Sequence, residues 1–183
     1  MIYYFKDIEN LDKKIFNNLK IYLPKSRKEK IKKITNKNQQ NIRILEYFLI
    51  HKFLNLKEFE DFKYTKYGKP YLPNSKHFNI SHCENFLCIS FADTPVGIDV
   101  QKKVSYNEKI AKYICNDYEL EQLKNSNSKD IDLTKLWIKK ESFIKCLGID
   151  ISFNLKKLDY KNCTFEYYQI DDYFICECLK KDD

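Results

Sequence analysis

Oxygen-bearing side chains and a lysine are expected to meet where a predicted strand approaches a predicted helix. The strand covers residues 96–101, and its alternation places Asp99 and Gln101 on one face. The helix carries Glu141 and Lys145, which lie four residues apart and therefore on one helical face. If the strand meets the edge of the helix, Asp99, Gln101 and Glu141 converge on one small polar site beside Lys145.

Such a site suits a hard divalent cation that holds a phosphate. Mg2+ prefers an octahedron of oxygen ligands, and proteins usually supply one or two carboxylates while phosphate oxygens and waters complete it. The alternative is an ordinary solvated helix face, because a Glu–Lys pair at this spacing is common and contributes only about 0.2–0.5 kcal/mol. On these residues alone, the solvated face is the better interpretation.

The helix that would carry Glu141 is predicted from its apolar stripe and from its ends. The stripe consists of Leu133, Leu136, Ile144 and Leu147. Asp130 or Asp132 can serve as the N-cap, and Gly148 can end the helix. Lys140 also falls on the apolar stripe, so we expect its amine to pair with a carboxylate or carbonyl oxygen near the edge of the site.

Three strand-like runs joined by short turns precede that helix, which predicts an antiparallel meander with the Asp99 strand as its third member. The runs cover residues 78–81, 86–91 and 96–100. His82 closes the first run beside Ser81. A lone histidine is more often structural than a ligand, but its place in this meander favours a role near Asp99. The other predicted strands are residues 2–5, 163–169 and 173–179, of which the last two form a hairpin.

Helices are predicted elsewhere from apolar spacing and from capping boxes. Two of these helices cover residues 9–20 and 38–54. Three more begin with capping boxes: one at Ser26, one at Ser105 that runs to residue 114, and one at Asn116 that runs to residue 124. The helix that begins at Ser26 carries Lys28 and Lys30, for which a solvated face and a phosphate contact are evenly balanced interpretations. Arg43 lies beside an apolar stripe, whose edge its stem can cover.

The composition is that of a folded protein and excludes several classes. The 183 residues are 43% hydrophobic, and only three are glycine, so no glycine-rich phosphate loop is present. No apolar run reaches the length of a membrane span, and the N-terminus lacks a signal sequence, so we expect a soluble cytoplasmic protein. The seven cysteines form no CxxC pair, so we expect free thiols and no zinc site.

Four of these segments, in this order, resemble the Sfp-type 4′-phosphopantetheinyl transferases. The matching segments are Gly68-Lys69-Pro70, Phe78-Asn79-Ile80-Ser81-His82, Val96-Gly97-Ile98-Asp99-Val100 and Trp137-Ile138-Lys139-Lys140-Glu141-Ser142-Phe143-Ile144-Lys145. Asp99 and Glu141 are separated by about the spacing that the family shows. Four ordered motifs are specific where one alone is weak, so they reverse the preference for a solvated helix face.

The resemblance implies an α+β fold of two similar halves, each with a small antiparallel sheet and helices, related by a pseudo-two-fold axis. We expect an N-terminal half at residues 1–95 and a C-terminal half, with the metal site, at residues 96–183, and an active site in the cleft between them. The implied reaction is Mg2+-dependent. It moves 4′-phosphopantetheine from coenzyme A to a serine of an apo acyl or peptidyl carrier protein and releases adenosine 3′,5′-bisphosphate. A monomer is expected.

The resemblance also implies roles for single residues. Asp99, Gln101 and Glu141 are the expected Mg2+ ligands, although the family often has an acid where Gln101 stands and an amide brings no charge. Glu141 is the expected base for the serine, and Lys145 the residue that contacts the phosphates and supports the leaving group. The expected coenzyme A contacts are Lys30, Arg43, Lys69, Ser81, His82 and Lys145.

Two other functions use part of the same features. A metal-dependent phosphohydrolase acting on a nucleotide-like diphosphate would use the same carboxylates with water as the nucleophile. A nucleic-acid binder would use the net charge of +7 and the aromatic residues. The aromatic residues follow apolar stripes instead of a basic surface, so nucleic acid is not an expected partner. A membrane is not an expected partner either. An acidic carrier protein gains electrostatic attraction from the same charge.

Overall fold

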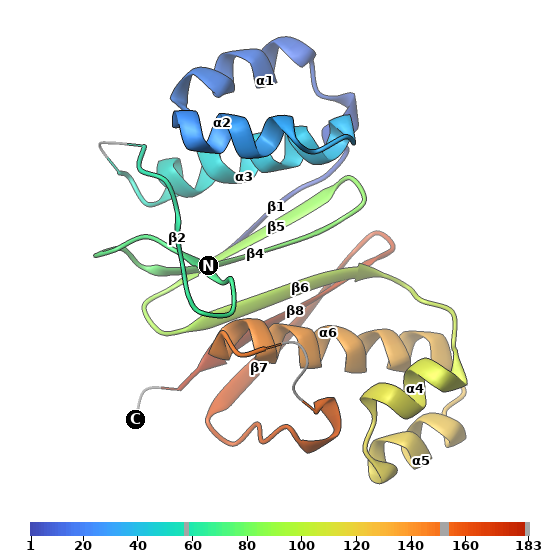
Figure 1. The fold of residues 1–183 in the computed structure, drawn as a ribbon. Coiled ribbons are helices and arrows are strands. Elements are labelled where there is room, and N and C mark those ends of the chain that lie inside the picture. The colour runs from blue at the N-terminus through green and yellow to red at the C-terminus, as the bar shows by residue number, and fades with distance from the viewer. Residues whose placement is uncertain (57–58, 151–153, 182–183) are drawn as a thin grey trace.

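Two three-stranded antiparallel sheets lie at the centre of the structure, with helices packed outside each of them (Figure 1). This computed structural model describes residues 1–56, 59–150 and 154–181. The strands are β1 (Ile2–Phe5), β2 (Lys63–Tyr64), β3 (Pro70–Tyr71), β4 (His77–Cys83), β5 (Phe86–Ala92), β6 (Val96–Lys102), β7 (Cys163–Ile170) and β8 (Tyr173–Lys180). The helices are α1 (Lys13–Leu19), α2 (Lys25–Lys32), α3 (Lys37–Phe53), α4 (Glu108–Ile114), α5 (Asp117–Asn125) and α6 (Lys129–Leu147), with 3-10 turns η1 (Ile8–Asn10), η2 (Lys20–Tyr22) and η3 (Leu155–Lys157).

The predicted three-stranded meander is wrong in its third member. Strands β4 and β5 pair as expected, but β6 leaves that sheet and pairs with β8, with Asp99 opposite Cys176. The sheet orders are β1-β5-β4 and β6-β8-β7. Alternation along a segment predicts a strand but not its partner, and here the long C-terminal hairpin supplies the partner for β6.

Side chains of β4 join the two sheets, which share no backbone strand pairing within the residues that the structure describes. The Asn79 side-chain oxygen accepts a hydrogen bond from the Ile98 amide at 2.8 Å, and the Ser81 hydroxyl oxygen accepts one from the Val100 amide at 3.3 Å. The sheets also share an apolar cluster that contains Phe86, Cys88, Ile98, Val100 and Ile175. The boundary between halves at residues 95 and 96 stays a prediction, because the turn from β5 to β6 lies there while the core continues across it.

Two of the predicted capping boxes are placed wrongly. Helix α2 begins after Pro24, and Ser26 lies inside it with its hydroxyl donating to Asp61 at 2.6 Å. Helix α4 is capped by Asn107 instead of Ser105, because the Asn107 side chain accepts hydrogen bonds from two amides of the first turn. In both cases a second polar or rigid residue near the helix start fits the turn better than the serine does.

Of the other predicted helix caps, two are confirmed and one is wrong. The capping box of Asn116 and Glu119 at the start of α5 is confirmed, with both reciprocal hydrogen bonds present. The N-cap of α6 is not Asp130 or Asp132, since both lie in its first turn. Gly148 ends α6 in the left-handed conformation, with φ of 63°, as predicted.

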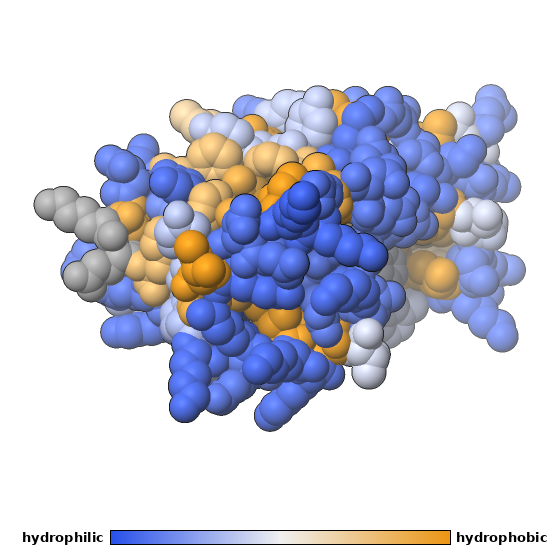
Figure 2. All heavy atoms as spheres, turned by 90° about the horizontal axis from the view of Figure 1, so that it is seen from above, coloured by the Kyte–Doolittle hydropathy of each residue, from blue (hydrophilic) through white to orange (hydrophobic). Residues whose placement is uncertain are grey.

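Helices α1 to α3 cover the first sheet, and α4 to α6 lie on the other side of the molecule, with α6 against β6 and β8 (Figure 1). Figure 2 looks down on the α1–α3 side and shows a mainly hydrophilic face with smaller hydrophobic areas. The exposed Lys32 and Lys33 at the end of α2 agree with the solvated interpretation of the lysine run. None of the described helices combines the length and apolarity that crossing a bilayer requires.

Candidate active site

A single glycine allows helix α6 to lie directly on strand β6. A Cβ atom on Gly97 would be 1.9 Å from the carbonyl oxygen of Ser142 and 2.3 Å from the amide nitrogen of Cys146, distances that no side chain can occupy. The close approach brings the same face of β6, which also carries Asp99, against the helix that carries Glu141 and Lys145. The sequence analysis assigned no role to Gly97, although a glycine inside a strand signals close backbone contact.

Asp99 is fixed through one carboxylate oxygen and unpartnered at the other. It is 2% exposed, and its Oδ1 accepts hydrogen bonds from the Lys145 amine at 2.5 Å and from the Ser81 hydroxyl at 2.9 Å. The Lys145 amine also donates to the Ser81 oxygen at 3.1 Å. Asp99 Oδ2 is buried and has no hydrogen-bond partner among the described residues. A buried carboxylate oxygen without a partner is costly unless a ligand completes it.

Glu141 adds a second carboxylate to this cluster. It is 8% exposed, and burial raises its pKa; the negative charge of Asp99 raises it further, and Lys145 opposes the shift. Two acidic groups with one unpartnered oxygen fit a hard cation that prefers oxygen donors, so the residues present fit Mg2+. Gln101 shares the strand face but is only half-buried, and in the described part of the chain its side chain makes no hydrogen bond to Asp99 or Glu141.

Glu141 and Lys145 open onto a pocket of about 520 Å³ between β4, α6 and the loop before β3. Lys69 also lines this pocket, but its amine donates to the main-chain oxygens of Val96 at 2.8 Å and Cys146 at 2.9 Å. Burial lowers its pKa. Lys69 therefore ties the start of β6 to the end of α6 while its stem forms part of the pocket wall.

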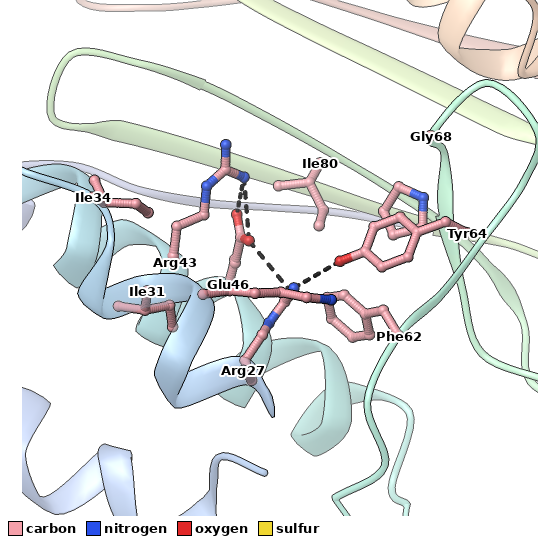
Figure 3. Close-up of a pocket in the computed structure, with 11 residues that line it drawn as sticks. Arg27, Ile31, Ile34, Arg43, Glu46, Phe62, Tyr64, Gly68 and Ile80 are labelled. Carbon is pink, nitrogen blue, oxygen red and sulfur yellow. Dashed lines mark hydrogen bonds and ion pairs between the residues drawn. The ribbon is translucent and has the colours of Figure 1, made fainter. Parts of the chain in front are cut away.

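A second pocket, of about 380 Å³, adjoins the first and is lined by cations (Figure 3). The two pockets share the wall residues Gly68, Pro70 and Ile80. Lys30 and Arg43, which were both predicted as ligand contacts, line this pocket together with Arg27. Lys28 does not line either pocket, so the lysine run divides between a pocket contact and solvated positions.

Arg27 and Glu46 are site residues that the sequence analysis missed. Glu46 lies between the two arginines: Arg43 Nη1 is 2.9 Å from Glu46 Oε2, and Arg27 Nη2 is 3.8 Å from Oε1. Arg27 Nη1 also donates to the Tyr64 hydroxyl at 2.7 Å. Burial raises the pKa of Glu46, while both arginines lower it. The available signal was the spacing of Glu46 four residues after Ile42, which puts a charge on the apolar face of α3.

His82 lines neither pocket, but it lies within electrostatic range of Arg43 in one and Lys145 in the other. Burial, and then the positive charges of Arg43 and Lys145, lower its pKa to about 4. The imidazole is therefore neutral in the free protein at neutral pH. Of the predicted residues, the structure thus joins Ser81, Asp99 and Lys145 by hydrogen bonds and sets Glu141 and His82 within electrostatic range of them.

Comparison with known proteins finds similarity to one superfamily of enzymes. Residues 95–177 match the family model described as the 4′-phosphopantetheinyl transferase superfamily. The chain is 32% identical to 4′-phosphopantetheinyl transferase gsp of Aneurinibacillus migulanus, over 75% of this chain and 61% of that protein. It is 36% identical to 4′-phosphopantetheinyl transferase Sfp of Bacillus subtilis, over 51% of this chain and 44% of that protein.

The chain thus spans between about two fifths and three fifths of the length of these curated relatives. Among solved structures, holo-[acyl-carrier-protein] synthase of Thermotoga maritima is 17% identical over 49% of this chain and 64% of that chain, with a TM-score of 0.36. The matched family region contains Gly97, Asp99, Glu141 and Lys145, the residues that build the carboxylate cluster against α6. Residues 95–177 of this chain thus match the 4′-phosphopantetheinyl transferase superfamily, and the chain is similar to Sfp-type members of it.

Proposed function

We propose that this chain transfers the 4′-phosphopantetheine group of coenzyme A to a serine of an apo acyl or peptidyl carrier protein and releases adenosine 3′,5′-bisphosphate. The observation that carries the proposal is the pair of adjoining pockets, one lined by Glu141 and by Lys145, which contacts Asp99, and the other lined by three cations. Coenzyme A carries a diphosphate and a separate 3′-phosphate, so it can use both pockets at once. The similarity of the chain to 4′-phosphopantetheinyl transferases supports the same substrate.

Glu141 is the proposed base. A serine hydroxyl is a weak nucleophile and needs a base within hydrogen-bond reach of its proton. Because burial raises the pKa of Glu141, its carboxylate accepts a proton more readily than an exposed glutamate does. The serine oxygen then attacks the phosphorus next to pantetheine, and the bond from that phosphorus to the oxygen of the nucleotide breaks.

Lys145 is the proposed contact for the diphosphate and the leaving group. Its amine carries three protons and donates to Asp99 and Ser81 in the free protein, which leaves donor capacity for a phosphate oxygen. The contact to Asp99 also orients the amine toward the pocket that it lines with Glu141. Neutralising the developing negative charge of the bisphosphate in this way favours its departure.

Asp99 and Glu141 are the proposed Mg2+ ligands, and Gln101 is a proposed third oxygen donor from the same strand face. A bound Mg2+ would neutralise diphosphate charge and polarise the phosphorus under attack. The unpartnered Oδ2 of Asp99 supports this role, since a cation there would satisfy the buried oxygen. Mg2+ should bind weakly to the free protein and more tightly with coenzyme A, because two carboxylates leave the octahedron to be completed by ligand oxygens and water.

Lys30, Arg43 and His82 are the proposed contacts for the nucleotide phosphates, and Lys69 and Ser81 are proposed as further contacts for coenzyme A. The net charge of +7 favours an acidic carrier protein as partner. The free state of all seven cysteines supports a reducing, cytoplasmic location. A monomer belongs to the same proposal.

Intact-mass measurement of apo carrier proteins, incubated with the enzyme, coenzyme A and Mg2+, tests the proposed reaction. We expect the carrier mass to rise by one phosphopantetheine group, and that rise to vanish when the acceptor serine is replaced by alanine. A metal-dependent phosphohydrolase would instead consume coenzyme A with no change in carrier mass. That outcome, with a panel of acyl and peptidyl carriers, would refute the transferase proposal.

Comparison of coenzyme A with its 3′-dephospho form tests the cationic pocket. If Lys30 and Arg43 hold the 3′-phosphate, dephospho-coenzyme A should bind more weakly, and added salt should narrow the difference. The measurement is calorimetric titration of both compounds at low and high salt. Equal affinities at low salt would mean that Lys30 belongs to a solvated helix face and does not hold the 3′-phosphate.

A further inference from the structure

Three cysteine sulfurs meet at the C-terminal end of α6, and the elements that carry them are far apart in the sequence. Cys146 comes from the end of α6, Cys163 from the start of β7, and Cys178 from β8. Their Sγ atoms all lie within 4.8 Å of one another. The sequence analysis expected no metal-binding thiols because the chain has no CxxC pair, but strand pairing and the close approach of α6 assemble the three without that spacing.

The register of the sheet explains the convergence. Cys178 lies opposite Gly97 on β6, so the helix that packs on Gly97 also covers Cys178. Cys163 pairs with Lys180, two residues beyond Cys178, and therefore shares the face of the hairpin that carries Cys178. Cys146 follows Lys145 directly and projects from α6 into this corner, where its thiol also donates to the Pro95 carbonyl at 3.1 Å.

The spacing of the sulfurs fits a soft metal ion. With a metal–sulfur bond of about 2.3 Å, three thiolates lie about 3.8 Å apart in a tetrahedron and about 4.0 Å apart in a trigonal plane. Both values are within the observed limit of 4.8 Å. Thiolate ligands select Zn2+ and Cu+ over hard cations such as Mg2+.

The surroundings distinguish this cluster from ordinary buried thiols. Cys146 and Cys178 are buried, but Cys163 is half-buried and gives an ion a path from solvent. A hydrogen bond with Cys178 lowers the pKa of Cys146, and the charge of Lys69 acts in the same direction. Burial raises the pKa of Cys163, and the charge of Lys180 opposes that shift. Such cations would offset the negative charge of a metal bound to three thiolates, which a purely apolar pocket would not do.

We propose that Cys146, Cys163 and Cys178 form a three-thiolate site for a soft d10 cation, Zn2+ or Cu+. The site joins α6 to the β7–β8 hairpin next to Lys145, so an occupied site would fix the end of the helix that carries the carboxylate cluster. The three sulfurs alone complete a trigonal Cu+ site, whereas Zn2+ takes a water or another donor as its fourth ligand. This site is separate from the proposed Mg2+ ligands and does not depend on the proposed transferase reaction.

Titration of the reduced, metal-free full chain under anaerobic conditions tests the proposal. Zn2+ and Cu+ are added separately in competition with a chromophoric chelator, and Co2+ serves as a probe for sulfur-to-metal charge-transfer absorption. We expect one equivalent of Zn2+ or Cu+ to bind and to raise the melting temperature. Comparison of the two measured affinities shows which of the two ions the site prefers.

Cys163→Ser removes the accessible ligand, and Cys83→Ser is its matched control, because Cys83 is also half-buried but lies outside the cluster. Cys163→Ser should weaken binding at least about tenfold and abolish both the thermal shift and the Co2+ absorption. Cys83→Ser should behave as the parent does. The proposal is overturned if neither Zn2+ nor Cu+ binds, or if both variants bind as the parent does. A stability measurement on metal-free Cys163→Ser checks that this variant folds, and Cys163→Ala repeats the test with a smaller apolar side chain.

Discussion

Helix α6 presents two lysines five residues apart, and each is paired with a carboxylate, but only one pair is complete. Lys140 is 2% exposed, and its amine donates to Glu119 Oε2 at 2.6 Å and to the Leu155 carbonyl at 2.9 Å. The same Glu119 oxygen accepts from the Asn116 amide at the start of α5. Lys145 pairs with Asp99 at 2.5 Å, yet the second oxygen of Asp99 has no partner in the described part of the chain.

The difference separates a charge that supports the fold from one kept ready for a ligand. Burying a charge costs free energy unless hydrogen bonds and an opposite charge compensate it, and the Lys140 pair is compensated on both sides. The Lys145 pair lacks that compensation, adds Glu141 with its raised pKa, and opens onto a pocket. Incomplete satisfaction at a buried acid is expected where a ligand supplies the missing partner.

The largest expected effect is on catalysis at the incomplete pair. Glu141→Gln should lower the rate of carrier modification by about 10²- to 10⁴-fold, because it removes the proposed base and one negative metal ligand. Stability should not fall, since burial already disfavours the charged form of Glu141. Modification rates by intact mass and unfolding by denaturant measure the two effects.

Glu119→Gln is the matched change at the complete pair. It should lower stability and leave the rate per folded molecule close to that of the parent. If Glu141→Gln modifies a carrier at the parental rate, Glu141 is neither the base nor an essential ligand, and the functional half of the comparison fails.

At the complete pair, the expected effect is on stability. Lys140→Met should lower the free energy of unfolding by about 3–5 kcal/mol, because Glu119 would keep a largely buried charge without its partner. The double variant Lys140→Met with Glu119→Gln should recover most of that loss. Chemical denaturation of the three proteins tests this. A loss below about 1 kcal/mol in Lys140→Met would mean that the pair contributes no more than an exposed one.

Gly97→Ala should damage both the fold and the incomplete pair. The added methyl would meet the backbone of Ser142 and Cys146, so α6 must move away from β6, at a cost of at least about 1–3 kcal/mol. The shift would separate Lys145 and Glu141 from Asp99, so activity should fall further than stability alone explains. Unfolding free energy and the rate per folded molecule are the two measurements.

Gly68→Ala is the control for this change. Gly68 has φ of 83° and no atom within 4 Å of an added Cβ, so its cost should come from backbone strain alone, about 1–2 kcal/mol. Equal losses of stability in the two alanine variants would show that close packing at Gly97 is not what holds α6 on β6.

The sequence predicted the local features of α6 well. Its end at Gly148 is confirmed, and so is its apolar stripe except for Leu147, which is exposed, because these features depend on the helix's own residues. The expected pairing of Lys140 with a carboxylate or carbonyl oxygen is also confirmed. The partners come from α5 and from the segment after α6, and not from the edge of the site as expected.

Features that depend on distant segments were not predictable in the same way. The partner of β6 was wrong because alternation does not encode which strand lies beside it. The pairing of Arg27 with the buried Glu46, and the meeting of the three cysteine sulfurs, need separate segments of the chain to pack together. Gly97 was visible as a strand glycine, but its role required knowing which helix lies on it.

The smallest expected effect is a pH dependence of stability set by His82, whose pKa is influenced by the charge of Lys145. Its pKa is about 4 in the folded protein against an ordinary value of 6.5, so between these values the unfolded chain binds a proton that the folded protein does not. Stability should therefore be unaffected by this group above pH 6.5 and should fall as the pH drops from 6.5 toward 4. Denaturation across this range should give a shallower slope for His82→Gln than for the parent.

Coenzyme A should reverse that effect if His82 contacts a phosphate. An anion beside the imidazole favours its charged form, so binding near pH 5.5 should take up a proton, which calorimetry in two buffers of different ionisation enthalpy measures. His82→Gln should lose this uptake, while His77→Gln should keep it, because partial desolvation of the ring and then the charge of Lys69, not that of Lys145, lower the pKa of His77. If the uptake persists in His82→Gln, another group binds the proton. Glu141 is then the next residue to examine, because burial and the charge of Asp99 already raise its pKa.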